Sequence, residues 1–176
     1  MSTPDRMRRA EREITAAAHL DAILDEAPFL SLALKDQDAP YVVPLCFGRD
    51  GRTLYVHSAH AGKKMDLLRR EPQVGFSAVA GMTVVPAATA CAWECHARSV
   101  VGTARVRIVE DPEERRRGLD AIMRHYAGGN NQGAAAYTEG SLARTCVVAL
   151  SVQTLRGKDT GAARTSPGRR RGGGLS

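Results

Sequence analysis

Three short hydrophobic stretches near the start of the chain constrain its fold more than any other feature of the sequence. They span residues 29–34, 41–47 and 53–58, and apolar residues roughly alternate with small or polar ones in each. A period of two is typical of β-strands with one buried face. Short turn-forming segments, residues 36–40 and 49–52, separate one stretch from the next. Because connections this short join antiparallel strands, the sequence predicts an antiparallel meander.

The rest of the chain adds helices and further strands. Helical periodicity predicts a helix over 16–26 with Thr15 as its cap, a second over 62–70, a third from Asp111 to about residue 126, and a weaker one over 134–143. The third helix is expected to face inward through Leu119, Ile122, Met123 and Tyr126. Further strands are predicted at 74–79, 99–109 and 145–152, with residues 80–96 as a connection.

This order of elements predicts the fold class. Hairpin-linked strands dominate and few helices intervene, which argues against a doubly wound parallel sheet. We therefore expect a mainly β (α+β) fold, an antiparallel barrel with peripheral helices. Pro44 lies within the second strand. Because proline cannot donate to a strand ladder, it predicts an edge, a bulge or a place where backbone meets a ligand.

Charge divides the chain into parts. Of the net charge of +6, residues 156–176 carry +5, so the first 155 residues are nearly neutral. We expect a charged arm over 1–13, one folded domain over 14–158 and a disordered basic tail over 159–176; the low-complexity character begins at Gly157. Since the positive charge lies in that tail and not on a face with interleaved aromatic residues, nucleic acid is disfavoured as a partner.

No segment resembles a membrane anchor or a secretory signal. The longest nearly apolar stretch, residues 84–93, is interrupted by Pro86 and Thr89, and it is far shorter than the roughly 20 residues that span a bilayer. The first 13 residues are polar and are not followed by an apolar region. The sequence therefore predicts a cytoplasmic protein without a membrane partner.

The four cysteines are expected to be reduced thiols in such a compartment. Cys91, Cys95 and His96 form the only group in the sequence that resembles a metal site. Their spacing differs from the usual C-x2-C pair, and no second ligand pair follows at the distance found in zinc fingers. We predict no metal.

The most informative segment for function is residues 54–68. A strand ends at His57 and Ser58, a short loop follows, and a helix opens at Gly62, Lys63 and Lys64. A hydroxyl, free amides at a helix start and two ammonium groups can together bind an anion. The lysines oppose the helix dipole, which favours a bound anion. The sequence contains no Walker A or G-x-G-x-x-G loop, so a phosphate here would belong to a cofactor held outside the nucleotide-binding folds.

Three segments then resemble one family. Residues 40–48, 54–64 and 98–104 are similar to the pyridoxamine 5'-phosphate oxidase-like flavoproteins, and within them to the branch related to nitroimidazole-resistance proteins. The helix that begins at Asp111, with residues 123–126, and the pair at 157–158 also resemble that branch. The similarity covers roughly residues 8–158.

The resemblance implies a split β-barrel that binds FMN at a homodimer interface. It further implies an FMN-dependent oxidoreductase that reduces nitro-aromatic or related small molecules. The alternative is a flavin-, deazaflavin- or haem-binding protein without nitroreductase turnover.

Site residues are carried over by position from the same resemblance. The isoalloxazine would be lined by Val42, Val43, Pro44, Leu45 and Cys46. The ribityl chain and phosphate would lie beside Val56, His57 and Ser58, and the phosphate would be held by Gly62, Lys63 and Lys64. Trp93 and Ser99 would approach a flavin of the opposite subunit. His57 would act as a proton donor or only hydrogen-bond the cofactor.

Overall fold

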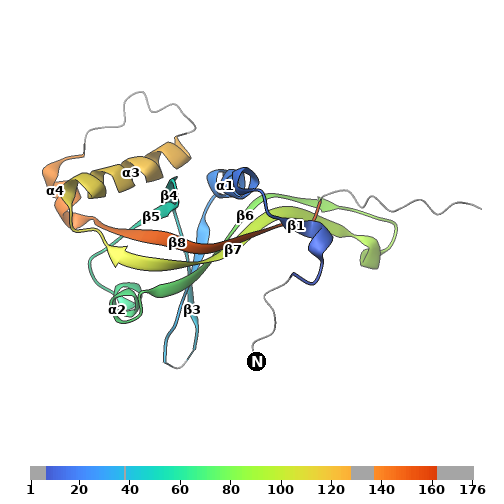
Figure 1. Cartoon of the computed structure of the whole chain (residues 1–176), viewed down its shortest axis with the longest axis horizontal. Coiled ribbons are helices and arrows are strands. Elements are labelled where there is room, and N and C mark those ends of the chain that lie inside the picture. Colours follow the sequence, from blue (N-terminus) through green and yellow to red (C-terminus); the bar gives the residue numbers. More distant parts are fainter. Residues whose placement is uncertain (1–6, 38, 128–136, 162–176) are drawn as a thin grey trace, which may run out of the picture.

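One antiparallel sheet organises the part of the chain that the computed structural model describes, residues 7–37, 39–127 and 137–161 (Figure 1). Its strands run in the order β3-β2-β6-β7-β8-β5-β4, and β1 pairs with β8 beside this path. Their bounds are β1 Glu13–Ile14, β2 Leu30–Leu34, β3 Tyr41–Leu45, β4 Phe47–Asp50, β5 Thr53–Ser58, β6 Gln73–Val85, β7 Glu94–Ile108 and β8 Cys146–Asp159. The α-helices are α1 Ala17–Glu26, α2 Lys63–Arg70, α3 Pro112–Tyr126 and α4 Glu139–Arg144, with single 3-10 turns at Ala10–Arg12 and Ala90–Ala92.

The sheet is a split barrel because its two edge strands are joined through one residue. β3 pairs with β2 at one edge and β4 pairs with β5 at the other, yet only Cys46 separates β3 from β4 in the chain. The sheet must therefore curve until its edges approach each other, and it stays open at Cys46. The predicted mainly β, antiparallel split barrel with peripheral helices is confirmed.

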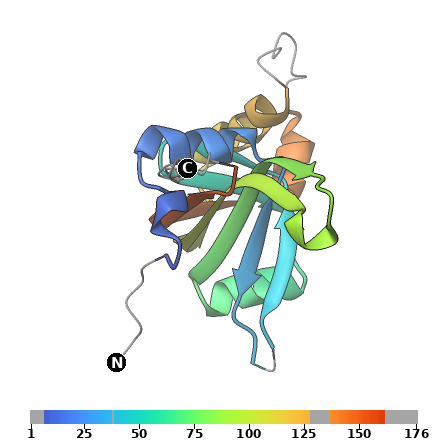
Figure 2. The ribbon, with the colours of Figure 1, turned by 90° about the vertical axis from the view of Figure 1, so that its right-hand side faces the viewer.

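The main core fills the concave side of this sheet. Alternate residues of the strands, among them Leu32, Phe76 and Leu150, are buried there. Helices α1 and α2 add apolar side chains to the same core from above and below the sheet (Figure 2). Burial of this kind contributes about 25 cal/mol per Å² of apolar surface, so the barrel interior is the main source of stability.

A second, smaller cluster joins α3 to the outer face of the sheet. Tyr55 and Val147 point outward from β5 and β8 and pack against Ala121 and Ile122 of α3. Strand β5 therefore serves both layers, because Leu54 and Val56 belong to the main core. This alternation places the residue after Val56 on the α3 side.

Two of the helix starts show different physical causes. Asp111 accepts hydrogen bonds from the backbone N–H groups of Glu113 (3.3 Å) and Glu114 (3.0 Å), and Pro112 follows it; this predicted cap is confirmed. The cap predicted at Thr15 is wrong. Helix α1 begins after Ala16 without any side-chain cap bond, so burial of its apolar face stabilises it.

The predicted inward face of α3 is partly wrong. Ile122 is buried, but Met123 and Tyr126 are 41% and 44% exposed. The cause is the close approach of β4 to the helix backbone: a Cβ on Gly48 would lie 2.2 Å from the carbonyl carbon of Ala121. Small residues at the contact let the strand touch the helix along this line and leave the longer side chains outside it.

Strands β6 and β7 are longer than predicted. We expected residues 80–96 to be a connection, but β6 continues to Val85 and β7 begins at Glu94. Residues 81–95 are exposed on both faces of this hairpin. Without a buried face there is no alternation of apolar and polar residues, so the usual signal of a strand is missing.

Strand β8 also extends beyond the prediction, to Asp159. Gly157, which we expected to begin the tail, is buried in the sheet. A Cβ there would lie 2.4 Å from Leu20 and 2.9 Å from Ile14, so the position needs a residue without a side chain. The rest of the predicted tail, residues 162–176, lies outside the described residues.

The first strand lies within the predicted arm. Glu13 and Ile14 pair with Lys158 and Gly157 of β8, so the end of that arm is part of the sheet. Residues 1–6 lie outside the described part, as do residues 134–136 of the weak helix prediction; its remainder corresponds to α4 at Glu139–Arg144. Among the helices of residues 7–37, 39–127 and 137–161, none has both the length and the hydrophobicity needed to cross a bilayer.

Candidate functional site

Strand β3 presents one exposed row of side chains. Val42, Pro44 and Cys46 are exposed, whereas Val43 and Leu45 are half-buried against the main core. Pro44 lies on an edge strand, which is one of the places expected for a proline in a sheet. The five residues predicted to line a ring system thus lie on two faces. Three side chains face outward, and two pack against the main core.

His57 continues this row onto the neighbouring strand. Phe47 and Val56 pair with each other and are buried in the main core. Cys46 and His57 are the next residues of the two strands, so both side chains point to the opposite, outer side. Both are exposed.

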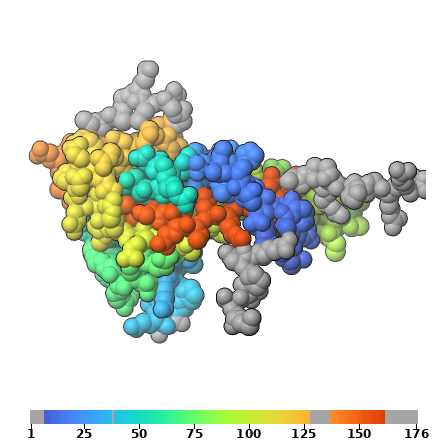
Figure 3. Space-filling model, viewed as in Figure 1, coloured from blue at the N-terminus to red at the C-terminus, as the bar shows by residue number. Residues whose placement is uncertain are grey.

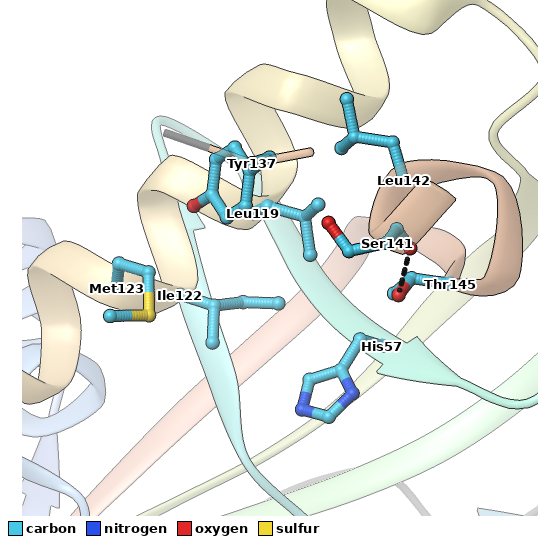
Figure 4. Close-up of a pocket in the computed structure, with 8 residues that line it drawn as sticks. All are labelled: His57, Leu119, Ile122, Met123, Tyr137, Ser141, Leu142 and Thr145. Atoms are coloured by element: carbon cyan, nitrogen blue, oxygen red, sulfur yellow. Dashed lines mark hydrogen bonds between the residues drawn. The ribbon is translucent and has the colours of Figure 1, made fainter. Parts of the chain in front are cut away.

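A pocket of about 230 Å³ opens beside His57 (Figure 4). It lies between β5, helix α3 and helix α4, and its apolar wall consists of Leu119, Ile122, Met123 and Leu142. Its polar side chains are His57, Tyr137, Ser141 and Thr145. His57, the predicted proton donor, therefore lines a small, mostly apolar cavity.

The hydrogen-bonding state of the polar groups differs around this pocket. Thr145 Oγ1 donates to the carbonyl of Ser141 at 2.9 Å, and Ser141 Oγ donates to that of Thr138 at 2.8 Å. The Tyr137 hydroxyl is buried. Burial first, and then a hydrogen bond to the Asp120 carboxylate, raises the pKa of Tyr137 to about 12.

The predicted anion site lies at the same end of β5 as His57. Ser58 is the last residue of that strand and pairs with Cys146, and Gly62 precedes α2 with a φ of 111°. Only glycine adopts such a backbone conformation readily. No side chain caps α2, so the amides at its start can accept an anion between Ser58 and the two lysines.

The two lysines of this site have different surroundings. Lys63 Nζ lies 2.8 Å from Asp36 Oδ2 and 5.1 Å from the centre of the Tyr41 ring. The hydrogen bond from Lys63, and then that from the backbone N–H of Gln37, lowers the pKa of Asp36. Lys64 is half-buried, and this burial lowers its pKa. An anion at α2 would therefore compete with Asp36 for Lys63 and relieve the desolvation of Lys64.

Trp93 is not brought to this site within one chain. It lies between β6 and β7, directly after the turn Ala90–Ala92, and Figure 1 shows the outer end of this hairpin far from α2. Its side chain is 54% exposed, and Nε1 donates to the carbonyl of Ala87 at 3.0 Å. Ser99 is half-buried in the middle of the sheet, opposite Val79 and Lys158. A role for these two residues would need a second subunit.

The group of residues that resembled a metal site does not gather ligands. Cys91 and Cys95 are exposed thiols, and His96 Nε2 lies 2.9 Å from Glu94 Oε2. Within the part of the chain that the structure describes, no three His, Cys, Asp or Glu side chains come together as a metal site.

Sequence reasoning missed most of the pocket. Tyr137 and Leu142 of the pocket carry no motif, and neither does Asp36, the partner of Lys63 at the anion site. Met123 was singled out only as a core residue. No local signal could have shown that these side chains surround His57 or Lys63.

Comparisons with known proteins identify a matching family and several structures with a similar fold. A family model described as Pyridoxamine 5'-phosphate oxidase matches residues 16–159. A solved structure from Bacteroides thetaiotaomicron, provisionally described as a 5-nitroimidazole antibiotic resistance protein, is similar at a TM-score of 0.73 and 29% identity. The similarity covers 84% of this chain and 86% of that one.

Two further structures share the fold. The FAD and haem binding protein of Mycobacterium smegmatis has a TM-score of 0.74 and 25% identity, covering 84% of this chain and 73% of that chain. The flavocytochrome Anf3 of Azotobacter vinelandii has a TM-score of 0.75 and 21% identity, covering 88% and 72%. No curated protein has significant sequence similarity to this chain.

Proposed function

This chain belongs to the pyridoxamine 5'-phosphate oxidase family, and from that premise we propose that it is an FMN-dependent oxidoreductase acting on small molecules. The observation that supports FMN most directly is the turn from β5 into α2. Its hydroxyl, its uncapped amides after a glycine with positive φ and its two ammonium groups form a donor set that suits a phosphate.

The outer row of β3 suits the ring system of the same cofactor. Val42, Pro44 and Cys46 form an exposed, mostly apolar row along and just after an edge strand, where backbone groups on the open edge can hydrogen-bond a ring. His57 ends this row, next to Cys46. Bound flavin supplies the electron chemistry, and the protein orients it and supplies protons.

His57 is proposed as the proton donor. Its ring is exposed beside the pocket and has no hydrogen-bond partner among the described residues, so its nitrogens are free to reach a bound molecule. Reduction of a nitro group consumes protons as well as electrons. The similarity to the Bacteroides protein supports nitro-aromatic compounds as substrates.

A homodimer is part of the proposal. Large apolar side chains are exposed along β6, β7 and the connection between them, among them Val79, Met82, Val84, Trp93 and Val101. Exposed apolar surface of this kind is typical of protein interfaces. A second copy covering it would bring Trp93 and Ser99 toward the other subunit's flavin.

The test is to identify the cofactor that purifies with the protein. Flavin gives two absorbance bands in the near-ultraviolet and blue regions, and mass spectrometry distinguishes FMN from FAD. A Soret band would instead favour haem, which the FAD and haem binding protein of Mycobacterium smegmatis has in its name.

The site assignment has its own test. Substituting Ser58→Ala together with Lys63→Ala should weaken FMN binding at least tenfold, because charge-assisted bonds contribute about 1.5–3 kcal/mol each. Ser151→Ala with Arg117→Ala removes one hydroxyl and one cation from exposed positions elsewhere and should leave the affinity unchanged. Equal affinity for FMN in both double variants would refute the site.

A further inference from the structure

Helix α3 ends at the place where the barrel splits. Its last residue is Tyr126, whose hydroxyl donates to the carbonyl of Pro28 at 2.9 Å and accepts from the backbone N–H of Phe47 at 3.2 Å. Both distances are close to those of ordinary hydrogen bonds. One side chain of α3 therefore joins the segment before β2 to the first residue of β4.

The strand register shows what this hydroxyl replaces. Leu30 pairs with Leu45 at the end of the β2–β3 ladder. Two residues further along, the same antiparallel register would place Pro28 opposite Phe47, but Phe47 belongs to β4 and pairs with Val56. The hydroxyl bonds to a backbone group of each of these two positions. It is therefore a spacer at the point where β4 leaves β2.

Cys46, the residue between β3 and β4, contacts the same hydroxyl. Burial raises the pKa of Tyr126, the bond from Phe47 lowers it, and a hydrogen bond with the Cys46 side chain raises it again. A tyrosine hydroxyl has one proton, and here that proton goes to the carbonyl of Pro28. In the contact with Cys46 the thiol is therefore the donor, and α3 holds it in place.

The same face of α3 follows the outer row of side chains. Leu119 and Met123 line the pocket beside His57, and Tyr126 follows them along the helix. Spacings of four and three residues place all three side chains on one face of a helix. The helix therefore borders the row from His57 to Cys46, and Tyr126 is the member of this face that bonds to the strand backbone.

We propose that Tyr126 is a positioning residue of the cofactor site, because its hydroxyl sets the distance between β2 and β4 at Cys46 and so fixes the end of the β3 row against which a flavin ring would bind. This rests on the proposed function, which gives no role to the last turn of α3. Tyr126 acts through the Phe47 backbone and the Cys46 thiol.

The variant Tyr126→Phe tests this role, since it keeps the aromatic ring and removes only the hydroxyl. His125 still attaches the end of the helix, because Nε2 donates to the carbonyl of Ala27 at 2.8 Å and the ring packs on Phe47 with the centroids 4.6 Å apart. The variant should therefore fold, with a melting temperature roughly 2–4 °C lower.

The matched control is Tyr55→Phe. It removes a hydroxyl that is bonded to Glu114 at 3.1 Å, near the start of the same helix, and should lower the melting temperature by a similar amount. Because Tyr55 packs against α3 away from Cys46, this variant separates a general weakening of the helix contact from the loss of the spacer.

Alkylation by iodoacetamide measures the junction without any flavin. Cys46 should react about threefold faster in Tyr126→Phe, because the thiol loses its hydrogen-bond partner. The exposed thiols Cys91 and Cys95 lie elsewhere, and the peptide that holds them should react at the same rate in every variant. Mass spectrometry of tryptic peptides gives both rates, and Tyr55→Phe should change neither.

Titrations with FMN and with riboflavin measure the effect on the cofactor. The two flavins share the ring and differ in the phosphate, so Tyr126→Phe should weaken both by the same factor, about fivefold, and should shift the visible absorbance of the bound ring. Tyr55→Phe should change neither affinity. Ser58→Ala with Lys63→Ala should weaken FMN and leave riboflavin unchanged, which distinguishes the ring end of the site from the phosphate end.

An unchanged flavin affinity or an unchanged Cys46 rate in Tyr126→Phe would overturn the inference. Equal effects of Tyr126→Phe and Tyr55→Phe would also overturn it, since weaker packing of α3 would then be the cause. If the unaltered protein bound neither flavin, the cofactor proposal would fail. The Cys46 rate would then decide by itself whether the hydroxyl fixes the junction.

Discussion

Neighbouring residues at the start of α2 show how differently two lysines can be held. Lys63 already has a carboxylate partner in Asp36, whereas Lys64 is half-buried beside Cys146 and has a lowered pKa. Burial also raises the pKa of the Cys146 thiol, so that thiol stays neutral and offers Lys64 no counter-charge near neutral pH. A phosphate would give Lys64 the partner that it lacks.

This difference predicts a pH dependence for FMN binding. The phosphate favours protonated Lys64, so its pKa is higher in the complex than in the free protein. Affinity should be constant below the lowered pKa of free Lys64, and it should fall as the pH rises from there toward the ordinary value of 10.5. Fluorescence titrations with FMN from pH 7 to about 10 would measure this fall.

Lys64→Arg should remove most of the fall, because a guanidinium stays charged over this range. Lys35→Arg, the same change at an exposed position, should leave the wild-type profile. A flat profile in the unaltered protein would show that Lys64 does not face the phosphate.

At the scale of elements, strand pairing and hydrogen bonds join the ends of β1, β7 and β8. Gly157 and Lys158 pair with Ile14 and Glu13, and Thr160 Oγ1 donates to the carbonyl of Cys95 at 2.8 Å. Helix α1 and β4 are tied in a similar way, since Arg49 Nε donates to Asp25 at 2.8 Å, and the two segments lie side by side in Figure 3. The fold therefore uses β8 to its last residue, Asp159, and also the residue that follows it, Thr160.

Two truncations test where the folded part ends. Ending the chain after Thr160 should leave the melting temperature and FMN binding nearly unchanged, because the Gly-, Arg- and Ser-rich sequence beyond it cannot bury enough surface to offset its ordering cost. Ending it after Arg156 removes the pairing with β1 and the packing of Gly157, and should lower the melting temperature by roughly 5–10 °C. Thermal denaturation followed by circular dichroism gives the melting temperature of each truncated protein. If both truncations lowered it equally, the residues beyond Thr160 would contribute to the fold.

At the scale of the whole molecule, the exposed apolar hairpin predicts self-association. Sedimentation equilibrium should give a dimer, with an interface too large for a transient contact. Val84→Ser with Trp93→Ser replaces two apolar side chains that are 53% and 54% exposed. The change should shift the equilibrium toward monomer and lower the melting temperature of the monomer only slightly. Flavin affinity should fall with the dimer. A flavin-saturated monomer of the unaltered protein would rule out the proposed role of Ser99.

Much of the fold could be predicted because its signals are local. Alternation marked β2, β3 and β5, and the pair Asp111–Pro112 marked the start of α3 within a residue. The errors lie where the local sequence pattern does not indicate which residues are buried. Residues 81–95 extend a hairpin with neither face buried, and Gly157 lies in the sheet because Ile14 and Leu20 leave no room for a side chain.

The sequence by itself determined that the strands run antiparallel, the turn from β5 into a lysine-bearing helix, and the resemblance through which the family was predicted; that the predicted strand 41–47 divides into β3 and β4 at opposite edges of the sheet was not foreseen. Each depends on residues close together in the chain, where periodicity and turn chemistry act directly. Only the tertiary structure decided that His57 and Cys46 share one outer row, that Asp36 holds Lys63, and that Tyr137 and Leu142 enclose a pocket beside His57. Those contacts join segments tens of residues apart, and they exist because the sheet curves and α3 approaches β4 at Gly48.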